Sequence, residues 1–428
     1  MYEETIRCSC VHLLLPVVQS LSDAAPSGTM EETDLIPRWA GECMQAFSDR
    51  HELFDFLAAY AQERGGDAAE RRAAAPLIKT YMFEVVGAGR PHSPPPEALF
   101  GGLQGFETLY PIEPGLYSAE TESMTGFLER VDDWYWVLYT TERTGVADPF
   151  VSRLTAESPY LDHVWLSAPL LQGFWEHWIV PRHEEHRFVR IHFSFVDEFV
   201  GTSAAPKSDE DDESSVERKV SKITLMEQKQ TLERILPQLQ GLLASFYVID
   251  ALRFPAVNGS GGHDVYFNGK VTNRSSDFSD HREQVLAIIA VYRSVNAIIR
   301  QHMDSGSPFV IEFSRPLSPG RWDSFLDVTF ERGTGSFQLW GSPIPYPDGT
   351  RHVYGVDLQA WQELYLELSK DHMLISLPPA TSRSVVHRLL THTQQHLEPD
   401  TTAFVGETAY SDLVRAAMEQ GGVVSHDD

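Results

Sequence analysis

The chain has 428 residues, of which 42% are hydrophobic and 11% aromatic, and its formal net charge at pH 7 is -27. This composition is typical of a globular protein and excludes an intrinsically disordered one, and the length predicts two domains. The acidic excess opposes a broad, nonspecific interaction with nucleic acid or with anionic lipid.

The cysteines and the apolar runs indicate where the protein works. Cys8, Cys10 and Cys43 all lie near the N-terminus and the rest of the chain has no cysteine, which is typical of a reducing compartment. No apolar run approaches the roughly 18–20 residues that a membrane span needs. We therefore expect a cytoplasmic protein that does not enter a membrane. Residues 1–30 are expected to be disordered, or residues 1–29 to precede a true translation start at Met30.

Residues 31–200 are predicted to form a mixed, helix-rich α+β domain. Asp49 and Glu52 form a capping box ahead of an apolar periodic run, which predicts a helix. Residues 133–141 are rich in aromatic and β-branched side chains and residues 187–196 alternate between apolar and polar ones, which predicts two strands. In chain order we expect helices at 49–63 and 67–86, a strand at 133–141, a helix at 159–178 and a strand at 187–196.

An acidic tract separates this region from the next. Asp209–Glu213 is a run of five consecutive carboxylates, which repel one another and resist burial. We interpret residues 201–217 as a solvated linker between two domains, and the alternative is a docking site for a basic partner.

Residues 218–428 are predicted to form a second α+β domain, an antiparallel β-meander flanked by amphipathic helices. The apolar period is helical before residue 304 and changes to two after it. The expected helices are 214–247, 281–303, 382–397 and 410–419, and the expected strands are 309–313, 326–330, 337–340, 353–358, 364–368 and 373–377. Because strands and helices do not alternate as a doubly wound fold requires, the predicted class is α+β; no internal repeat is evident.

The segment from Asn258 to Arg282 concentrates directional polar groups. It combines a glycine-rich start with several cations and leads into a helix that is expected to begin near Ser279. The N–H groups of a helix N-terminus attract anions, and Lys and Arg side chains bind phosphate or carboxylate. We therefore predict an anion site in a loop, and the alternative is a polar network that pins that loop. The predicted ligand-binding residues are Lys270, Asn273, Arg274 and Arg282.

This pattern predicts a cytoplasmic interaction or regulatory component that recognises an anionic small molecule or a protein partner through residues 258–282. The alternative is a hydrolase that cleaves phosphoester bonds with the same segment. In that enzyme an aspartate would orient a histidine as general base, while Lys270 and Arg274 would stabilise developing negative charge. The candidates for the histidine and the aspartate are His263, Asp264, Asp280 and His281. The sequence leaves open whether the chain is an enzyme.

The spacing of other motifs excludes several familiar sites. Val271 stands where a Walker A loop needs Ser or Thr, and His183 and His186 are three residues apart instead of the four of His-Glu-x-x-His. The chain has no Gly-x-Ser-x-Gly elbow and no dinucleotide fingerprint. We therefore predict neither a metal site nor a cofactor.

A basic stripe is predicted on the helix expected at 382–397. Arg388, His392 and His396 follow one another at intervals of four residues, so they lie on one helix face. We interpret this face as solvated, and the alternative is a surface that meets an acidic partner, such as the 209–213 tract of another copy of the chain.

Overall fold

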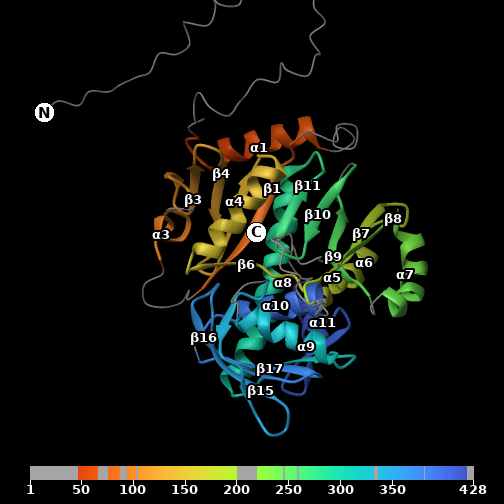
Figure 1. The fold of residues 1–428 in the computed structure, drawn as a ribbon. Coiled ribbons are helices and arrows are strands. Elements are labelled where there is room, and N and C mark those ends of the chain that lie inside the picture. The colour runs from red at the N-terminus through yellow and green to blue at the C-terminus, as the bar shows by residue number, and fades with distance from the viewer. Residues whose placement is uncertain are drawn as a thin grey trace, which may run out of the picture. The chain divides into compact units, whose positions relative to one another are not determined.

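The computed structural model describes residues 47–65, 76–86, 94–102, 105–199, 219–243, 246–257, 260–331, 336–379 and 381–421. From Phe47 onward the chain forms one compact unit in which helices pack against two antiparallel sheets (Figure 1), so the predicted α+β class is confirmed. Residues 1–30 and the tract Asp209–Glu213 lie outside the described residues.

Within the described residues, the larger sheet, which we call sheet A, has eleven strands. Ten run in the order β2-β3-β4-β5-β1-β11-β10-β9-β7-β8, and β6 pairs with β1. Their bounds are β1 (Lys79–Val85), β2 (Thr108–Glu113), β3 (Leu116–Glu120), β4 (Thr125–Arg130), β5 (Tyr135–Thr140), β6 (Leu161–His163), β7 (Phe188–Asp197), β8 (Lys219–Gln228), β9 (Val248–Pro255), β10 (Gly262–Tyr266) and β11 (Lys270–Asn273). The strands predicted at 133–141 and 187–196 are confirmed as β5 and β7.

The strands of sheet A come from both sides of residues 201–217. β7 pairs with β8 and with β9, and β1 pairs with β11. The predicted division into two domains at residues 201–217 is therefore not confirmed, because backbone hydrogen bonds join the two regions into one sheet.

The smaller sheet, sheet B, has eight strands in the part of the chain that the structure describes. Their order is β13-β15-β16-β17-β12-β18-β19, and β14 pairs with β15. Their bounds are β12 (Phe309–Phe313), β13 (Leu339–Gly341), β14 (Ile344–Pro345), β15 (Arg351–Asp357), β16 (Gln362–Leu368), β17 (His372–Ser376), β18 (Thr401–Val405) and β19 (Thr408–Ala409). The predicted antiparallel meander is confirmed by β15, β16 and β17, and β12 is the strand predicted at 309–313.

The helices lie between and around these sheets. Their bounds are α1 (Arg50–Arg64), α3 (Pro96–Phe100), α4 (Thr144–Glu157), α5 (Ala168–Phe174), α6 (Val180–Arg182), α7 (Lys229–Leu243), α8 (Phe278–Asp304), α9 (Pro319–Leu326), α10 (Ser384–His392) and α11 (Tyr410–Gly421), with π-helical turns η1 (Trp175–Ile179), η2 (Asp327–Glu331) and η3 (Thr393–Leu397). The helices predicted at 49–63, 281–303, 382–397 and 410–419 are confirmed by α1, α8, α10 with η3, and α11. Asp49 caps α1 as the capping box predicts, because its side chain accepts the N–H of Glu52.

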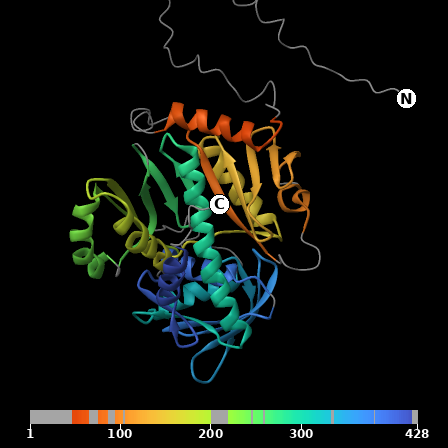
Figure 2. The ribbon, with the colours of Figure 1, turned by 180° about the vertical axis from the view of Figure 1, so that it is seen from behind.

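Helix α8 joins the two sheets. Figure 2 shows it running from sheet A to sheet B, and it contacts α1, β1 and β11 at one end and β18 at the other. Asp277 caps its N-terminus by accepting the N–H groups of Ser279 and Asp280. The predicted stripe, which includes Val285 and Ile299, is buried, and one hydrophobic core continues from sheet A through α8 to sheet B.

The two sheets share a topology that the sequence did not indicate. In each, a first helix leads into a strand, which we call the leading strand, and a second helix follows it. A four-strand meander comes next, and its last strand pairs with the leading strand. A third helix then connects to a further strand, which pairs with the other side of the leading strand. In sheet A this series is α1-β1-α3-β2-β3-β4-β5-α4-β6. In sheet B it is α8-β12-α9-β13-β15-β16-β17-α10-β18, where β14 is a short addition to β15.

Four predicted elements are wrong. Residues 79–85 form the strand β1 instead of part of a helix, because a central strand that is buried on both faces lacks alternation. Residues 219–228 form β8 by pairing with β7, so only α7 remains of the long helix expected at 214–247. The expected helix at 159–178 is instead β6 followed by α5 and η1. The expected strand at 326–330 is instead the last residue of α9 and most of η2. Pro319 at the first position of α9 is a typical helix start.

Candidate functional site

The segment predicted as an anion-binding loop is largely a β-hairpin. β10 and β11 pair from His263–Asn273 to Val265–Val271. The connection contains Gly269 with φ 73°, where a Cβ atom would lie 2.6 Å from the carbonyl oxygen of Val164. An Asn-Gly pair between apolar runs is a strong hairpin signal, so the turn could have been found from the sequence. The hairpin fixes its polar side chains against neighbouring strands and helices.

Two of the predicted anion-binding cations have carboxylate partners far away in the sequence. Lys270 donates from Nζ to both carboxylate oxygens of Asp148 at 2.8 Å. Arg282 donates to Glu129 at 2.6 and 3.1 Å, and Arg50 also contacts this carboxylate. Burial alone would raise the pKa of Glu129, but the hydrogen bonds and the charge of Arg282 hold it below its usual value. Each of these cations is therefore already neutralised.

The third cation, Arg274, and the predicted orienting residue Asp264 bind each other. Asp264 also accepts from Arg253 at 2.6 and 3.0 Å, and these guanidinium groups lower the pKa of the carboxyl against the opposing effect of its burial. Asn273 holds the backbone and hydroxyl of Ser275 with its carbonyl oxygen. The structure therefore does not bring the four predicted ligand-binding residues together around one anion.

The predicted histidines do meet, but in the interior. His263 Nε2 lies 3.0 Å from Asp280 Oδ2, His263 Nδ1 lies 3.3 Å from His281 Nδ1, and His281 Nε2 lies 2.7 Å from Thr80 Oγ1. One directional series satisfies all three contacts: Thr80 donates to His281, His281 donates to His263, and His263 donates to Asp280. Burial holds the pKa of His281 well below its usual value. Both rings are fully buried, so a substrate does not reach them in this structure.

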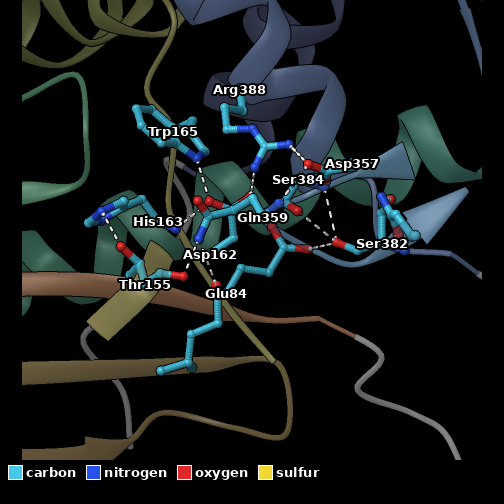
Figure 3. Close-up of polar contacts among 12 residues, drawn as sticks. Glu84, Thr155, Asp162, His163, Trp165, Asp357, Gln359, Ser382, Ser384 and Arg388 are labelled. Atoms are coloured by element: carbon cyan, nitrogen blue, oxygen red, sulfur yellow. Dashed lines mark hydrogen bonds and ion pairs between the residues drawn. The ribbon is translucent and has the colours of Figure 1, made fainter. Parts of the chain in front are cut away.

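A second polar cluster lies where sheet A meets sheet B (Figure 3). Arg388 on α10 forms ion pairs with Asp357 of β15 and with Asp162 of β6, the latter at 3.6 Å. Asp162 also accepts the indole N–H of Trp165 at 2.7 Å and the backbone N–H of His163 at 2.8 Å. Arg388 is 1% exposed and every residue of α10 is buried, so the solvated basic stripe predicted on this helix is wrong. The charge of Arg388 is balanced internally, by one carboxylate from each sheet.

Glu84 on β1 belongs to the same junction. Its carboxylate accepts hydrogen bonds from Tyr292 and Asn296 of α8 at 3.0 Å and from Ser382 at 3.1 Å. Burial, and then the negative charge of Asp162, raises the pKa of Glu84 to about 7. Full burial of these carboxylates indicates a structural role, since they connect β1, β6, β15, α8 and α10 instead of lining a cleft. In the described part of the chain, no three His, Cys, Asp or Glu residues are grouped to hold a metal ion.

Sheet B presents aromatic side chains to solvent on one face. Trp340 is 61% exposed and Tyr354 is 69% exposed. The rings of Tyr354 and Tyr365 lie 5.0 Å apart, and His352 stacks on Tyr346 at 3.7 Å. Tyr365 also contacts His352 Nδ1 through its hydroxyl at 2.7 Å. We call this surface, made by Trp340, Tyr346, His352, Tyr354 and Tyr365, the aromatic face.

Strand register places two carboxylates among these rings. Val356 lies opposite Trp340 and Glu363, whereas His352 lies opposite Glu367. Residues that are directly opposite across neighbouring strands project from the same face, so Glu363 and Glu367 share the aromatic face. His352 Nε2 lies 3.9 Å from Glu367.

The sequence had indicated the strands of this surface but not the surface itself. His352 and Tyr354 alternate with buried Val353 and Gly355, and both alternating sets contain apolar or aromatic side chains. That pattern could not decide which set faces the core. Val353 packs in the same core as side chains of α10 and α11, and in Figure 1 the labelled helices α9, α10 and α11 lie above β15 and β17.

Comparison with known proteins identifies a family that the chain matches over most of its length. A family model described as MJECL33-like protein matches residues 43–412. No curated protein matches the chain, and no solved structure matches it. Among the described helices, none has the length and apolar character to cross a membrane.

Proposed function

The chain belongs to the MJECL33-like protein family, and we propose that it is an interaction component that docks a protein partner on the aromatic face of sheet B. The contrast between two topologically equivalent sheets carries this proposal. Strands β1 and β5 are buried on both faces, whereas β15, β16 and β17 are buried on one face only. In sheet A the second face packs against α3 and α4. A protein partner would cover the corresponding open surface of sheet B.

The residue types on this face favour a protein partner. Trp and Tyr are enriched in protein interfaces and among the residues that contribute most to binding. Each large aromatic side chain removes on the order of 150–250 Å² from water when it is buried. Trp361, in the turn between β15 and β16, is also 63% exposed, and it adopts φ 48°. Strained backbone at a bulky residue concentrates at binding sites.

This proposal agrees with the prediction of an interaction component from the sequence. It differs in the binding surface, which is the aromatic face instead of residues 258–282. Residues 258–282 are the weaker choice, because Lys270, Arg274 and Arg282 already face carboxylates of this chain. A ligand anion would have to displace those carboxylates. We place the partner in the cytoplasm because of the distribution of the cysteines.

One observation favours the hydrolase as a second candidate. The contact of 3.0 Å between His263 Nε2 and Asp280 Oδ2 matches a base with its orienting carboxylate. Its burial opposes this role, and Lys270 and Arg274 are engaged elsewhere. Cleavage of a model phosphoester that His263→Gln abolishes would favour the enzyme over the interaction component.

A paired substitution tests the docking role. We expect Trp340→Ser with Tyr354→Ser, introduced in the native gene, to shift the protein in size-exclusion chromatography of a cell extract from a complex to the position of the free chain. The physical reason is the loss of the two largest exposed apolar contacts of the face. The thermal midpoint of the purified variant should stay within a few degrees of the native one, since surface changes alter stability little.

Phe188→Ser with Phe246→Ser is the matched control, because both side chains are large, exposed and outside sheet B. This control variant should elute with the native complex. A native chain that elutes free, or a complex that resists Trp340→Ser with Tyr354→Ser, would contradict the docking role.

A further inference from the structure

The carboxylates of the aromatic face indicate the chemistry of its partner. We propose that the docking segment of the partner is extended and arginine-rich, and that it lies along β16. This inference rests on the docking role proposed above and adds the charge and the conformation of the bound segment.

The spacing of side chains along β16 carries the inference. Glu363, Tyr365 and Glu367 follow one another at every second position, so they project from the same face. The strand rise places neighbouring members about 7 Å apart and the two carboxylates about 14 Å apart. An extended segment has the same period, so alternate residues of a partner can meet a carboxylate, a ring and a second carboxylate. Tyr354 on the neighbouring strand β15 and Trp340 on β13, the next strand beyond it, widen this row with exposed rings.

Arginine matches both kinds of group in this row. A guanidinium binds carboxylates through paired N–H donors and also stacks on aromatic rings. The chain makes such ring contacts itself: Arg300 lies 4.2 Å from the ring centroid of Trp134, and Arg182 lies 5.2 Å from that of Trp178. Lysine matches the carboxylates equally well in charge but lacks the planar group that stacks on Tyr354 and Trp340.

Charge decides against the other occupants. A second copy of this chain in a twofold interface would bring Glu363 and Glu367 against the same carboxylates, and each copy carries a net charge of -27. The acidic tract Asp209–Glu213 has the same sign as the face. A cationic segment of another protein is the occupant whose charge is complementary to this surface.

The test is a titration of the purified full-length chain with three synthetic peptides of equal length. One carries arginine at alternate positions, the second lysine at those positions and the third glutamate. We expect saturable binding of the arginine peptide, weaker binding of the lysine peptide and no binding of the glutamate peptide. Isothermal calorimetry measures the affinity, and sedimentation of the chain alone measures self-association.

Three paired variants locate the binding. Trp340→Ser with Tyr354→Ser removes exposed rings, and Glu363→Gln with Glu367→Gln removes the carboxylates. Each pair should weaken arginine-peptide binding about tenfold, the effect of two exposed ring or charge contacts. The control, Glu184→Gln with Glu185→Gln, removes two exposed charges from the turn before β7 and should leave the affinity unchanged.

Each contrary result overturns the inference. Equal losses in the Glu363/Glu367 and Glu184/Glu185 pairs would show attraction to net charge alone, and self-association that Trp340→Ser with Tyr354→Ser abolishes would assign the face to a second copy. Absence of arginine-peptide binding would refute the proposal that the docking segment of the partner is arginine-rich. The docking role would still stand if the native complex remained sensitive to Trp340→Ser with Tyr354→Ser, so the two failures are distinguishable.

Discussion

Substitution of Arg388 by Met should lower the free energy of unfolding by about 3–5 kcal/mol. Arg388 is buried with Asp162 and Asp357, both of which are fully buried. Without the guanidinium, the carboxylates of Asp162 and Asp357 would remain in the interior and would lose the ion pairs that balance their charge. Chemical denaturation followed by tryptophan fluorescence measures the effect, since Trp165 donates its indole N–H to Asp162.

An exposed ion pair of this chain provides the control. Arg415 and Asp412 lie one helical turn apart on α11, and each side chain is more than half exposed. Arg415→Met should change the free energy of unfolding by less than about 1 kcal/mol. Combining Arg388→Met with Asp162→Asn and Asp357→Asn should recover part of the loss, because neutral groups replace the uncompensated charges. Equal effects of Arg388→Met and Arg415→Met would contradict the structural role of the buried cluster.

Substitution of Glu84 by Gln should make stability less sensitive to rising pH. The pKa of Glu84 in the folded protein, about 7, lies above its ordinary value of 4.5. The contribution of Glu84 to stability is therefore fully present below pH 4.5 and is lost as the pH rises to about 7. Glu84→Gln lacks this loss, so its stability relative to the native chain should rise by about 3 kcal/mol across that interval, at about 1.4 kcal/mol per pH unit.

Denaturation midpoints of both proteins, measured from below pH 4.5 to above pH 7, check this prediction. The amide introduced by Glu84→Gln has one acceptor oxygen where the native carboxylate accepts from Tyr292, Asn296 and Ser382, so we also expect a constant offset between the two curves. Only the change of the difference with pH reports the ionisation. A difference that stays constant, or that falls as the pH rises, would show that Glu84 is ionised throughout.

The elements that could be predicted from the sequence are those with one buried side. Helix α8 has a continuous apolar stripe, and β7 and β15 alternate along their length. Strand β1 has no such pattern, because α8 packs on one of its faces, where it contacts Thr80 and Glu84, while α3 and α4 cover the other. The shared topology of sheets A and B was also beyond the sequence, since chains with little residue similarity can follow the same strand order.

For the candidate site in the β10–β11 hairpin, the sequence predicted which residues are polar but not which groups they contact. The described residues 260–282 do form a polar network, but the partners of Lys270 and Arg282 are Asp148 and Glu129, more than a hundred residues away in the sequence. Spacing along the chain does not reveal such partners. The same limit explains Arg388: its helix is fully buried, and the carboxylates that balance its charge lie on strands of two different sheets.

The aromatic face was hidden for a related reason. Alternation in β15 and β16 predicts that one side is buried, but Tyr354 and Tyr365 are as apolar as many core residues. The choice between the two sides depends on where α8, α10 and α11 pack, which is a tertiary property. Exposed aromatic side chains on such a strand become informative only once the buried side is known.

Site-specific photocrosslinking in cells tests most directly whether the aromatic face is the docking surface. A benzophenone amino acid is placed at the position of Trp340 or Tyr354 on that face, at Arg274 in the hairpin, or at Phe188 on β7. We predict that irradiation yields an adduct with another protein at the positions of Trp340 and Tyr354 and none at those of Arg274 and Phe188. Adducts at Arg274 without adducts at Trp340 and Tyr354 would contradict the account and return the interaction to residues 258–282.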